Sequence, residues 1–313
     1  MISKNSKIFV AGHKGMLGSA IYRKLKSEGY NNIITRSKEE LDLTNQNKVN
    51  NFFQNENIDV VLLAAGKVGG IEANRNDLTN FLITNMEIEM NVIRAAFENK
   101  VKHFVFMGSS CIYPKDSKQP IKEKYLLTGP LEPTNEGYAI AKIAGLKACE
   151  YINKEYNMDY ISVMPTNLYG VNDNFDPINS HVISGIMQRM HIAKENNDSF
   201  MEIWGTGEVY REFLYVDDAA DAIIFLMNNY SGSEFVNIGS GVDMTIKELA
   251  FKIKDVVGFE GELRFDDTKP DGMYRKHLDV TKLTELGWKP KTSLEDGLKK
   301  MYNWFLENNC YEN

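Results

Sequence analysis

The sequence predicts an α/β fold built on a doubly wound parallel sheet, followed by a smaller and irregular carboxyl-terminal domain. Short, continuously apolar runs that suit buried strands alternate with helical segments over the first half of the chain. From Thr166 onward this alternation becomes irregular. We therefore expect a first domain over residues 1–165, completed by later sheet elements from about 214–240, and a second domain over residues 166–313.

The expected elements succeed one another in the order that such a sheet requires. Five runs rich in Val, Ile or Phe are expected to form strands: 7–11, 32–36, 59–66, 103–108 and 160–165. Helical segments are expected between and after them, at 19–25, 46–55, 78–99, 138–156, 216–228, 246–257 and 294–307. Ligands of parallel α/β sheets bind at the carboxyl ends of the strands. Residues that directly follow a strand are therefore the candidate site residues.

A glycine-rich turn, GHKGMLG at 12–18, joins the first expected strand to the first helix. Glycines at such a turn let backbone N–H groups approach a pyrophosphate, and the helix N-terminus adds about half a positive charge. The Gly-x-x-Gly-x-x-Gly spacing resembles the variant found in short-chain dehydrogenase/reductases. The turn thus predicts a Rossmann-type dinucleotide site that includes Gly12, Lys14, Gly15, Met16 and Gly18.

The second strand should end beside the adenosine ribose of a bound dinucleotide, and it ends in a cation. An acidic residue there would accept a hydrogen bond from NAD, whereas Arg36, Lys38 and Lys14 could neutralise the extra phosphate of NADP. NADP(H) is therefore the expected cofactor. Asp42 is placed either to accept a hydrogen bond from the adenine amine or to cap the next helix. Further cofactor contacts are expected where the third strand ends, at Ala64, Ala65 and Gly66.

Tyr138 and Lys142 lie four residues apart, and so they share one face of the expected helix. A lysine ammonium beside a phenol, which ordinarily titrates near pH ~10, favours phenolate and makes the phenol a usable acid near neutrality. Ser109, at the end of the fourth strand, could polarise a substrate oxygen. Each residue alone has an ordinary structural explanation. Together, on compatible elements, they predict a Ser/Tyr/Lys catalytic triad.

Composition and charge are those of a globular enzyme. The 313 residues carry a net charge of −7, which argues against a general nucleic-acid surface. The three cysteines, Cys111, Cys149 and Cys310, show no metal-like spacing and suggest neither a disulfide framework nor a metal site. No apolar run approaches the ~20 residues of a membrane span, and so we expect a cytoplasmic protein without membrane partners.

Several motifs resemble those of the GDP-L-fucose synthases, a family of extended short-chain dehydrogenase/reductases. They are GHKGMLG at 12–18, GSSCIYP at 108–114, EPTNEGYAIAK at 132–142 and MPTNLYG at 164–170. The resemblance continues through NSHVI at 179–183, WGTG at 204–207 and REFLYVDD at 211–218. It therefore covers most of the chain, and the Ser-Ser-Cys and Asn-Ser-His motifs separate this family from generic sugar-nucleotide epimerases and dehydratases.

The resemblance implies a reaction on GDP-4-keto-6-deoxy-D-mannose, with epimerisation at C3 and C5 followed by NADPH reduction at C4. By this analogy Cys111 and His181 are the acid–base pair of the epimerisation. An ordinary thiol and an ordinary imidazole titrate near pH ~8.5 and ~6.5, so either can exchange a proton near neutrality. Ser109 and Tyr138 would supply hydrogen bonds to the enediolate, and Lys142 would also contact the nicotinamide ribose.

The same resemblance implies where the ligands lie. Arg189, Arg211 and Lys276 would contact the nucleotide diphosphate, and Trp204 would pack beside guanine. Other implied substrate contacts are Asn167, His181 and Asp271, and the nicotinamide would lie against Pro165, Thr166 and Leu168. A homodimer is implied as well, through a four-helix bundle of helices 78–99 and 138–156. The apolar residues suited to it are Leu82, Met86, Met90, Ile143, Leu146 and Tyr151.

Two alternatives stay open at this point. The chain could act only as a C4 reductase on a related GDP-4-keto sugar, such as a heptose, that another protein has already epimerised. Gly137 before Tyr138, and Val171-Asn172 after Gly170, depart from the family pattern and leave the identity of the sugar open. The chain could also be a non-catalytic NADP-binding regulator, but such a protein could dispense with Tyr138 or Lys142.

Overall fold

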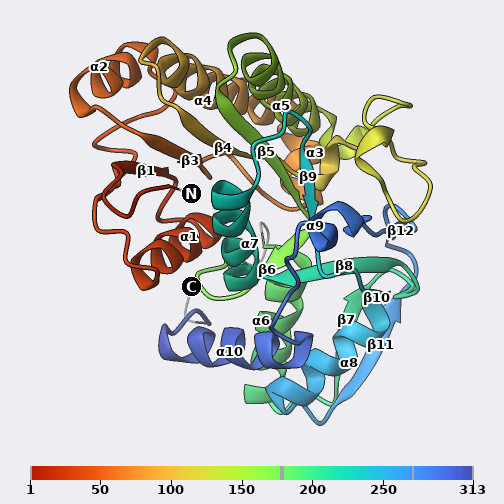
Figure 1. Cartoon of the computed structure of the whole chain (residues 1–313). Helices are drawn as coiled ribbons and strands as arrows, with labels where there is room; N and C mark the ends of the chain where they lie inside the picture. The colour runs from red at the N-terminus through yellow and green to blue at the C-terminus, as the bar shows by residue number, and fades with distance from the viewer. Residues whose placement is uncertain (1, 177–179, 270, 312–313) are drawn as a thin grey trace.

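The computed structural model describes residues 2–176, 180–269 and 271–311. Figure 1 shows a layered α/β body in the red-to-green first half of the chain, to which the later elements α7 (Val216–Asn229) and β9 (Val236–Ile238) also belong, with most of the other later segments gathered below it. In the part of the chain that is described, no helix combines the length and the apolar character needed to cross a bilayer.

A six-stranded sheet of parallel strands forms the core of the first half. Its strands lie in the order β2-β1-β3-β4-β5-β9. Their bounds are Ile8–Ala11 for β1, Ile33–Ile34 for β2, Val60–Leu63 for β3, His103–Met107 for β4, Asp159–Pro165 for β5 and Val236–Ile238 for β9. The predicted doubly wound α/β fold is confirmed by this sheet and its helices. The last strand, β9, comes from far along the chain, within the later segment expected to return to the sheet.

Helices cover both faces of the sheet (Figure 1). Successive residues of β1 point to opposite faces, since Ile8 and Val10 belong to one apolar cluster and Phe9 and Ala11 to another. The first cluster includes residues of α1 (Met16–Ser27) and α7 (Val216–Asn229), which pack together. The second cluster lies under α2 (Gln46–Glu56), α4 (Leu78–Glu98) and α5 (Glu136–Tyr156). The close packing of α4 against α5 fixes the helix that carries Tyr138 and Lys142.

The second half builds a smaller layer around a third apolar cluster. Strand β8 (Tyr210–Tyr215) pairs with β6 (Asn167–Tyr169), β10 (Asp243–Thr245) and β12 (Arg275–Lys276). Strands β7 (Phe200–Trp204) and β11 (Glu262–Asp266) form a separate parallel pair. The helices of this half are α6 (Val182–Glu195), α8 (Ile246–Val257), α9 (Thr281–Glu285) and α10 (Leu294–Glu307). The remaining helical elements are α3 (Ile71–Asn76), η1 (Ser110–Ile112), η2 (Glu123–Tyr125) and η3 (Pro133–Asn135).

Some expected boundaries differ from the structure. The strand expected at 32–36 is reduced to the two residues of β2, and α1 begins earlier than residue 19, at Met16. The suggestion that Asp42 caps the following helix is wrong, because the side chain of Asn45 accepts the backbone N–H of Lys48 at 3.0 Å and caps α2. Asp42 instead accepts the backbone N–H and the hydroxyl of Thr44, at 3.0 and 2.8 Å.

Candidate active site

The predicted triad lies where β4 ends and α5 begins. Ser109 caps the short helix η1, and its hydroxyl accepts the backbone N–H of Cys111 at 3.3 Å. Lys142 is buried, and its ammonium lies 5.6 Å from the centre of the Tyr138 ring. A hydrogen bond from Lys142 Nζ to the Met107 carbonyl, 3.0 Å long, ties α5 to the end of β4. The structure therefore brings Ser109, Tyr138 and Lys142 to one edge of the sheet.

The protonation of Tyr138 is set by competing effects. Burial raises the pKa of the Tyr138 phenol, and this effect outweighs the lowering by Lys142 and by Ser109. Lys142 therefore lowers the pKa of the Tyr138 phenol, as expected. The expected net lowering of this pKa is wrong, because burial raises it by more. Burial also opposes the charge of Lys142, yet the carboxylate of Glu89 and the Tyr138 phenol raise the pKa of the lysine above its usual value. Lys142 is thus held as a cation and Tyr138 as a neutral phenol.

Two hydrogen-bond donors lie beside the sulfur of Cys111, and neither was predicted at that position from the sequence. The amide Nδ2 of Asn135 lies 3.3 Å from the sulfur, and the ammonium of Lys276 lies 3.6 Å from it. Lys276 was expected at the diphosphate, and the structure places it against the thiol. Asn135 was not predicted, although it belongs to the motif at 132–142 that contains the triad. An amide and an ammonium thus both face the sulfur of Cys111.

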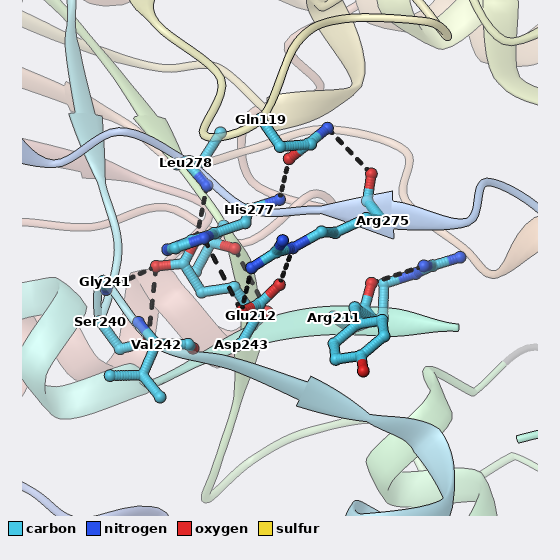
Figure 2. Close-up of polar contacts among 12 residues, drawn as sticks. Gln119, Arg211, Glu212, Ser240, Gly241, Val242, Asp243, Arg275, His277 and Leu278 are labelled. Carbon is cyan, nitrogen blue, oxygen red and sulfur yellow. Dashed lines mark hydrogen bonds and ion pairs between the residues drawn. The ribbon is translucent and has the colours of Figure 1, made fainter. Parts of the chain in front are cut away.

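A polar cluster holds the strand that carries Lys276 (Figure 2). The buried carboxylate of Glu212 accepts the backbone N–H groups of Leu278 and Gly241, both at 2.8 Å. Gln119 adds two contacts, since it accepts the N–H of His277 at 2.9 Å and donates to the Arg275 carbonyl at 3.0 Å. These contacts fix β12 on both sides of Lys276, and they place its ammonium beside Cys111.

Arg275 is anchored in the same cluster. Its guanidinium pairs with Asp243 of β10 through two contacts, at 2.5 and 3.0 Å. A bidentate pair of this kind fixes orientation as well as distance. The cluster thereby joins β8, β10 and β12, which are far apart in the sequence, at the edge of the site.

His181 stands at the start of α6, beside a carboxylate that the sequence did not reveal. Its Nδ1 lies 3.5 Å from Asp173, whose side chain is only 2% exposed. The hydrogen bond to Asp173 outweighs burial and raises the pKa of His181, which favours the protonated ring. Within the described ranges, no hydrogen bond joins His181 to Cys111, and Asn179 of the same motif lies outside those ranges. His181 is thus prepared to act as an acid.

The glycine turn has the tight geometry of a backbone cradle. Gly12 has a φ of +88°, and a Cβ on it would lie 2.7 Å from the backbone nitrogen of Ala65. A Cβ on Gly18 would lie 2.0 Å from the Gly12 carbonyl oxygen. Gly15 donates its N–H to the Gly12 carbonyl at 3.0 Å and caps α1, which begins at Met16. The turn thus presses against the end of β3, where Ala64, Ala65 and Gly66 follow, and it fits the pyrophosphate of a dinucleotide.

The cations expected near the adenosine are unequally available. Arg36 forms an ion pair with Glu56 at 2.7 Å and donates to the Thr35 carbonyl, so its charge is partly neutralised. Lys38 is exposed, and no ion pair to it is found among the residues that the structure describes. The backbone carbonyl of Lys14 accepts a hydrogen bond from Asn172 at 2.8 Å, which ties the glycine turn to the segment after β6. The side chain of Lys14 is likewise exposed and forms no ion pair with a described residue, so Lys14 and Lys38 are the cations best able to meet a phosphate.

Two arginines of the second half, Arg189 and Arg211, form no ion pair with a carboxylate of the described residues. Arg189 donates to the Gly185 carbonyl at 3.2 Å, and its guanidinium lies 5.7 Å from the Trp204 ring, which is 61% exposed. Arg211 donates to the Tyr210 carbonyl at 2.7 Å and points away from the Glu212 cluster in Figure 2. Burial lowers the pKa of both guanidinium groups, and for Arg211 this effect outweighs the opposing influence of the Asp271 charge. Both are suited to an anionic ligand.

The other predicted contacts also have structural roles. Asp271 accepts the N–H and the hydroxyl of Thr206, both at 2.8 Å, and so it shapes the turn after Trp204. Asn167 and Thr166 donate to the Glu212 carbonyl, at 2.8 and 3.2 Å, beside Pro165 at the end of β5 and Leu168 in β6. These contacts hold the carboxyl end of β5 against β8.

Comparisons with known proteins agree with this arrangement. The model of the family described as "NAD dependent epimerase/dehydratase family" matches residues 8–239. GDP-L-fucose synthase 1 of Arabidopsis thaliana is 56% identical, over 99% of this chain and 96% of its own length. GDP-L-fucose synthase of Escherichia coli K12 is 52% identical, over 96% of this chain and 97% of its own.

A solved structure is similar over the whole chain as well. It is a GDP-mannoheptose C4 reductase from Campylobacter jejuni with NADP bound, 40% identical, with a TM-score of 0.90 over 98% of this chain and 100% of that chain. The family model spans most of the chain, and the two synthases match it nearly end to end at more than half identity. The chain therefore belongs to the NAD-dependent epimerase/dehydratase family, within the group formed by the GDP-L-fucose synthases.

Proposed function

We propose that this chain is an NADPH-dependent GDP-L-fucose synthase. In this reaction GDP-4-keto-6-deoxy-D-mannose is epimerised at C3 and C5 and then reduced at C4. The observation that carries the proposal is the position of Cys111, beside both the Ser109–Tyr138–Lys142 group and the Lys276 ammonium. A reductase requires only the triad, whereas epimerisation requires an additional base of this kind.

Epimerisation begins with the loss of a ring proton beside the 4-keto group. Cys111 takes this proton as the base, with the donors Asn135 and Lys276 beside its sulfur. The electron pair moves onto the keto oxygen, where Ser109 and Tyr138 donate hydrogen bonds to the enediolate. His181, held protonated by Asp173, returns a proton to the opposite face and inverts the centre.

Reduction at C4 uses the same oxygen site. NADPH, when bound, supplies the hydride. Tyr138 gives its proton to the C4 oxygen as the alcohol forms, while Ser109 and Lys142 hold the oxygen and the phenol in place. The cradle at Gly12, Gly15 and Gly18 fits the dinucleotide, because a Cβ at Gly12 or Gly18 would collide with backbone.

We assign the remaining predicted residues to these two ligands. For the cofactor they are Lys14, Met16, Arg36, Lys38, Asp42, Ala64, Ala65, Gly66, Lys142, Pro165, Thr166 and Leu168. For the GDP-sugar they are Asn167, His181, Arg189, Trp204, Arg211, Asp271 and Lys276. The partly buried guanidinium groups of Arg189 and Arg211, which form no ion pair with a described residue, support a diphosphate. We keep the division at residue 165 between a cofactor domain and a substrate domain as part of this proposal.

The alternative is C4 reduction alone, on a GDP-4-keto-heptose. The similarity to heptose reductases, at 38–40% identity, favours keeping it. Purified enzyme and NADPH should be offered GDP-4-keto-6-deoxy-D-mannose and, separately, an already epimerised GDP-4-keto-heptose. The proposal requires efficient NADPH oxidation with the deoxyhexose. NADPH oxidation with the GDP-4-keto-heptose but not with the deoxyhexose would contradict the proposal, and it would identify the chain as a C4 reductase.

The cofactor preference gives one prediction. We expect wild-type enzyme to favour NADPH over NADH in kcat/KM, and Lys38→Gln to lower kcat/KM for NADPH about tenfold, since one charge-assisted hydrogen bond to the phosphate is lost. Lys48→Gln, an exposed change on the neighbouring helix α2, is the control. Equal kcat/KM for the two cofactors in the wild type would remove the basis for this preference.

The assembly gives another prediction, a homodimer through α4 and α5. Leu146 does not suit this interface, because it is only 1% exposed and packs inside the subunit. Ile83, Ile140 and Tyr151, which are 49%, 42% and 52% exposed on these helices, are better candidates for the contact. Light scattering at micromolar concentration should give twice the chain mass. A monomeric mass would contradict the proposal.

A further inference from the structure

Glu89 is a buried carboxylate that the steps above do not use. It lies on α4 and is 0% exposed, and one of its oxygens lies 2.9 Å from the ammonium of Lys142. Burying such a charge costs several kcal/mol unless a partner compensates it. The neighbouring helix makes room for the group, because a Cβ on Gly145 would lie 2.8 Å from the other Glu89 oxygen. Two packed helices therefore share a buried ion pair at the catalytic lysine.

The pair gives Lys142 a defined place. An ammonium has three N–H groups. One donates to the Met107 carbonyl at 3.0 Å and another faces Glu89. The third N–H group has no acceptor among the described residues. It is therefore available to donate to the Tyr138 phenol oxygen or to a hydroxyl of the cofactor. The contacts with Glu89 and with the Met107 carbonyl thus fix the position and the orientation of the Lys142 ammonium.

The pair also determines the charge that Tyr138 experiences. The groups that face Tyr138 are Lys142 on its own helix, Glu89 on α4, Cys111 on η1 and Ser109 at the end of β4. Ketone reduction needs the phenol as a proton donor, whereas an unopposed ammonium favours phenolate. Glu89 offsets that ammonium, and it acts with burial to raise the pKa of Tyr138.

We infer that Glu89 is a positioning residue, which holds Lys142 in place and offsets its charge so that Tyr138 remains a protonated donor for C4 reduction. This inference rests on the proposed reduction at C4. Glu89 contacts neither substrate nor the reacting atoms, and it acts through Lys142. Its signature is therefore a change in the ionisation of Tyr138 rather than a loss of the fold.

The test is the ionisation of Tyr138 in Glu89→Gln, which keeps the side-chain size and removes the charge. Ultraviolet difference absorbance of the full chain gives the phenolate signal, and the same titration in a Tyr138→Phe background isolates Tyr138. We expect the midpoint to fall by about one pH unit, a tenfold change in the ionisation constant. The alkaline limb of the pH profile of kcat should move to lower pH with it.

The control is Glu87→Gln, an exposed change on the same helix, which should leave the midpoint where it is in the wild type. An unchanged or higher midpoint in folded Glu89→Gln would overturn the inference. Should that variant not fold, Glu89→Asp is titrated in its place, because it keeps the charge but draws it back from the Lys142 ammonium. A lower Tyr138 midpoint than in the wild type would support the inference, and an identical midpoint would overturn it.

The titration requires no sugar nucleotide, and so its result is separate from that of the proposed function. If the Tyr138 midpoint shifts in Glu89→Gln but the wild type does not oxidise NADPH with GDP-4-keto-6-deoxy-D-mannose, the role of Glu89 is supported and the proposed substrate is wrong. If the wild type turns over this substrate but the Tyr138 midpoint does not shift in Glu89→Gln, the proposed function is supported and the role of Glu89 is wrong.

Discussion

Tyr138→Phe should lower turnover by about 10²–10⁴-fold, the usual contribution of a positioned proton donor. The ring packs edge-on against Phe81, with centroids 6.3 Å apart, and phenylalanine preserves this contact. The loss should therefore appear in kcat, with an unchanged circular dichroism spectrum and nearly unchanged NADPH binding. The loss in kcat is measured from the rate of NADPH oxidation at saturating substrate.

Tyr156→Phe is the matched control, because Tyr156 ends the same helix α5 and is 57% exposed. It should retain full activity. Lys142→Ala should also remove most activity, but the structure adds a stability cost that the sequence does not indicate. Without Lys142 the buried Glu89 has no ion-pair partner, a loss that typically costs about 3–5 kcal/mol. Near-normal NADPH oxidation by Tyr138→Phe would refute the triad.

Cys111→Ser should abolish deuterium incorporation at C3 and C5 while leaving reduction intact. A serine hydroxyl is a far poorer acid and base near neutrality than a thiol, even where Asn135 and Lys276 lie beside it. The variant should still oxidise NADPH with a substrate that is already epimerised, since hydride transfer needs only the triad and the cofactor. Nuclear magnetic resonance of the sugar ring, in deuterated water, measures the exchange.

Cys310→Ser is the control for this experiment, because Cys310 packs at the edge of the third apolar cluster, at the end of the chain. It should exchange ring hydrogens at the wild-type rate. Normal exchange by Cys111→Ser would assign the base to another residue. Loss of both exchange and reduction, in a folded variant, would mean that Cys111 also positions the substrate for hydride transfer.

The fold was predictable wherever the sequence carries a local signal. Helices α8 and α10 have the expected bounds, because their apolar residues recur with helical spacing and each begins at a side-chain cap, Thr245 or Ser293. Strands β6 and β12 were not predicted. They are only three and two residues long, and both pair with β8, which lies far away in the sequence. A pairing of that kind leaves no local pattern.

The site shows the same contrast. Ser109, Tyr138 and Lys142 follow strand ends or a helical spacing, and these patterns can be recognised in the sequence. Glu89 could not be predicted, because a single acidic residue on an amphipathic helix is usually solvated, and only the packing of α4 on α5 buries it. Asp173 likewise becomes a partner of His181 only through the folded chain, since an ordinary loop aspartate looks the same in sequence.

We expect one site, built around Cys111 and Tyr138, to carry out both the epimerisation and the reduction. The most direct measurement is turnover of GDP-4-keto-6-deoxy-D-mannose by wild-type enzyme and NADPH in deuterated water, with nuclear magnetic resonance of the product. We expect GDP-L-fucose that carries deuterium at both C3 and C5. A reduced product with deuterium at neither position would contradict this expectation, and it would identify the enzyme as a C4 reductase that receives its sugar already epimerised.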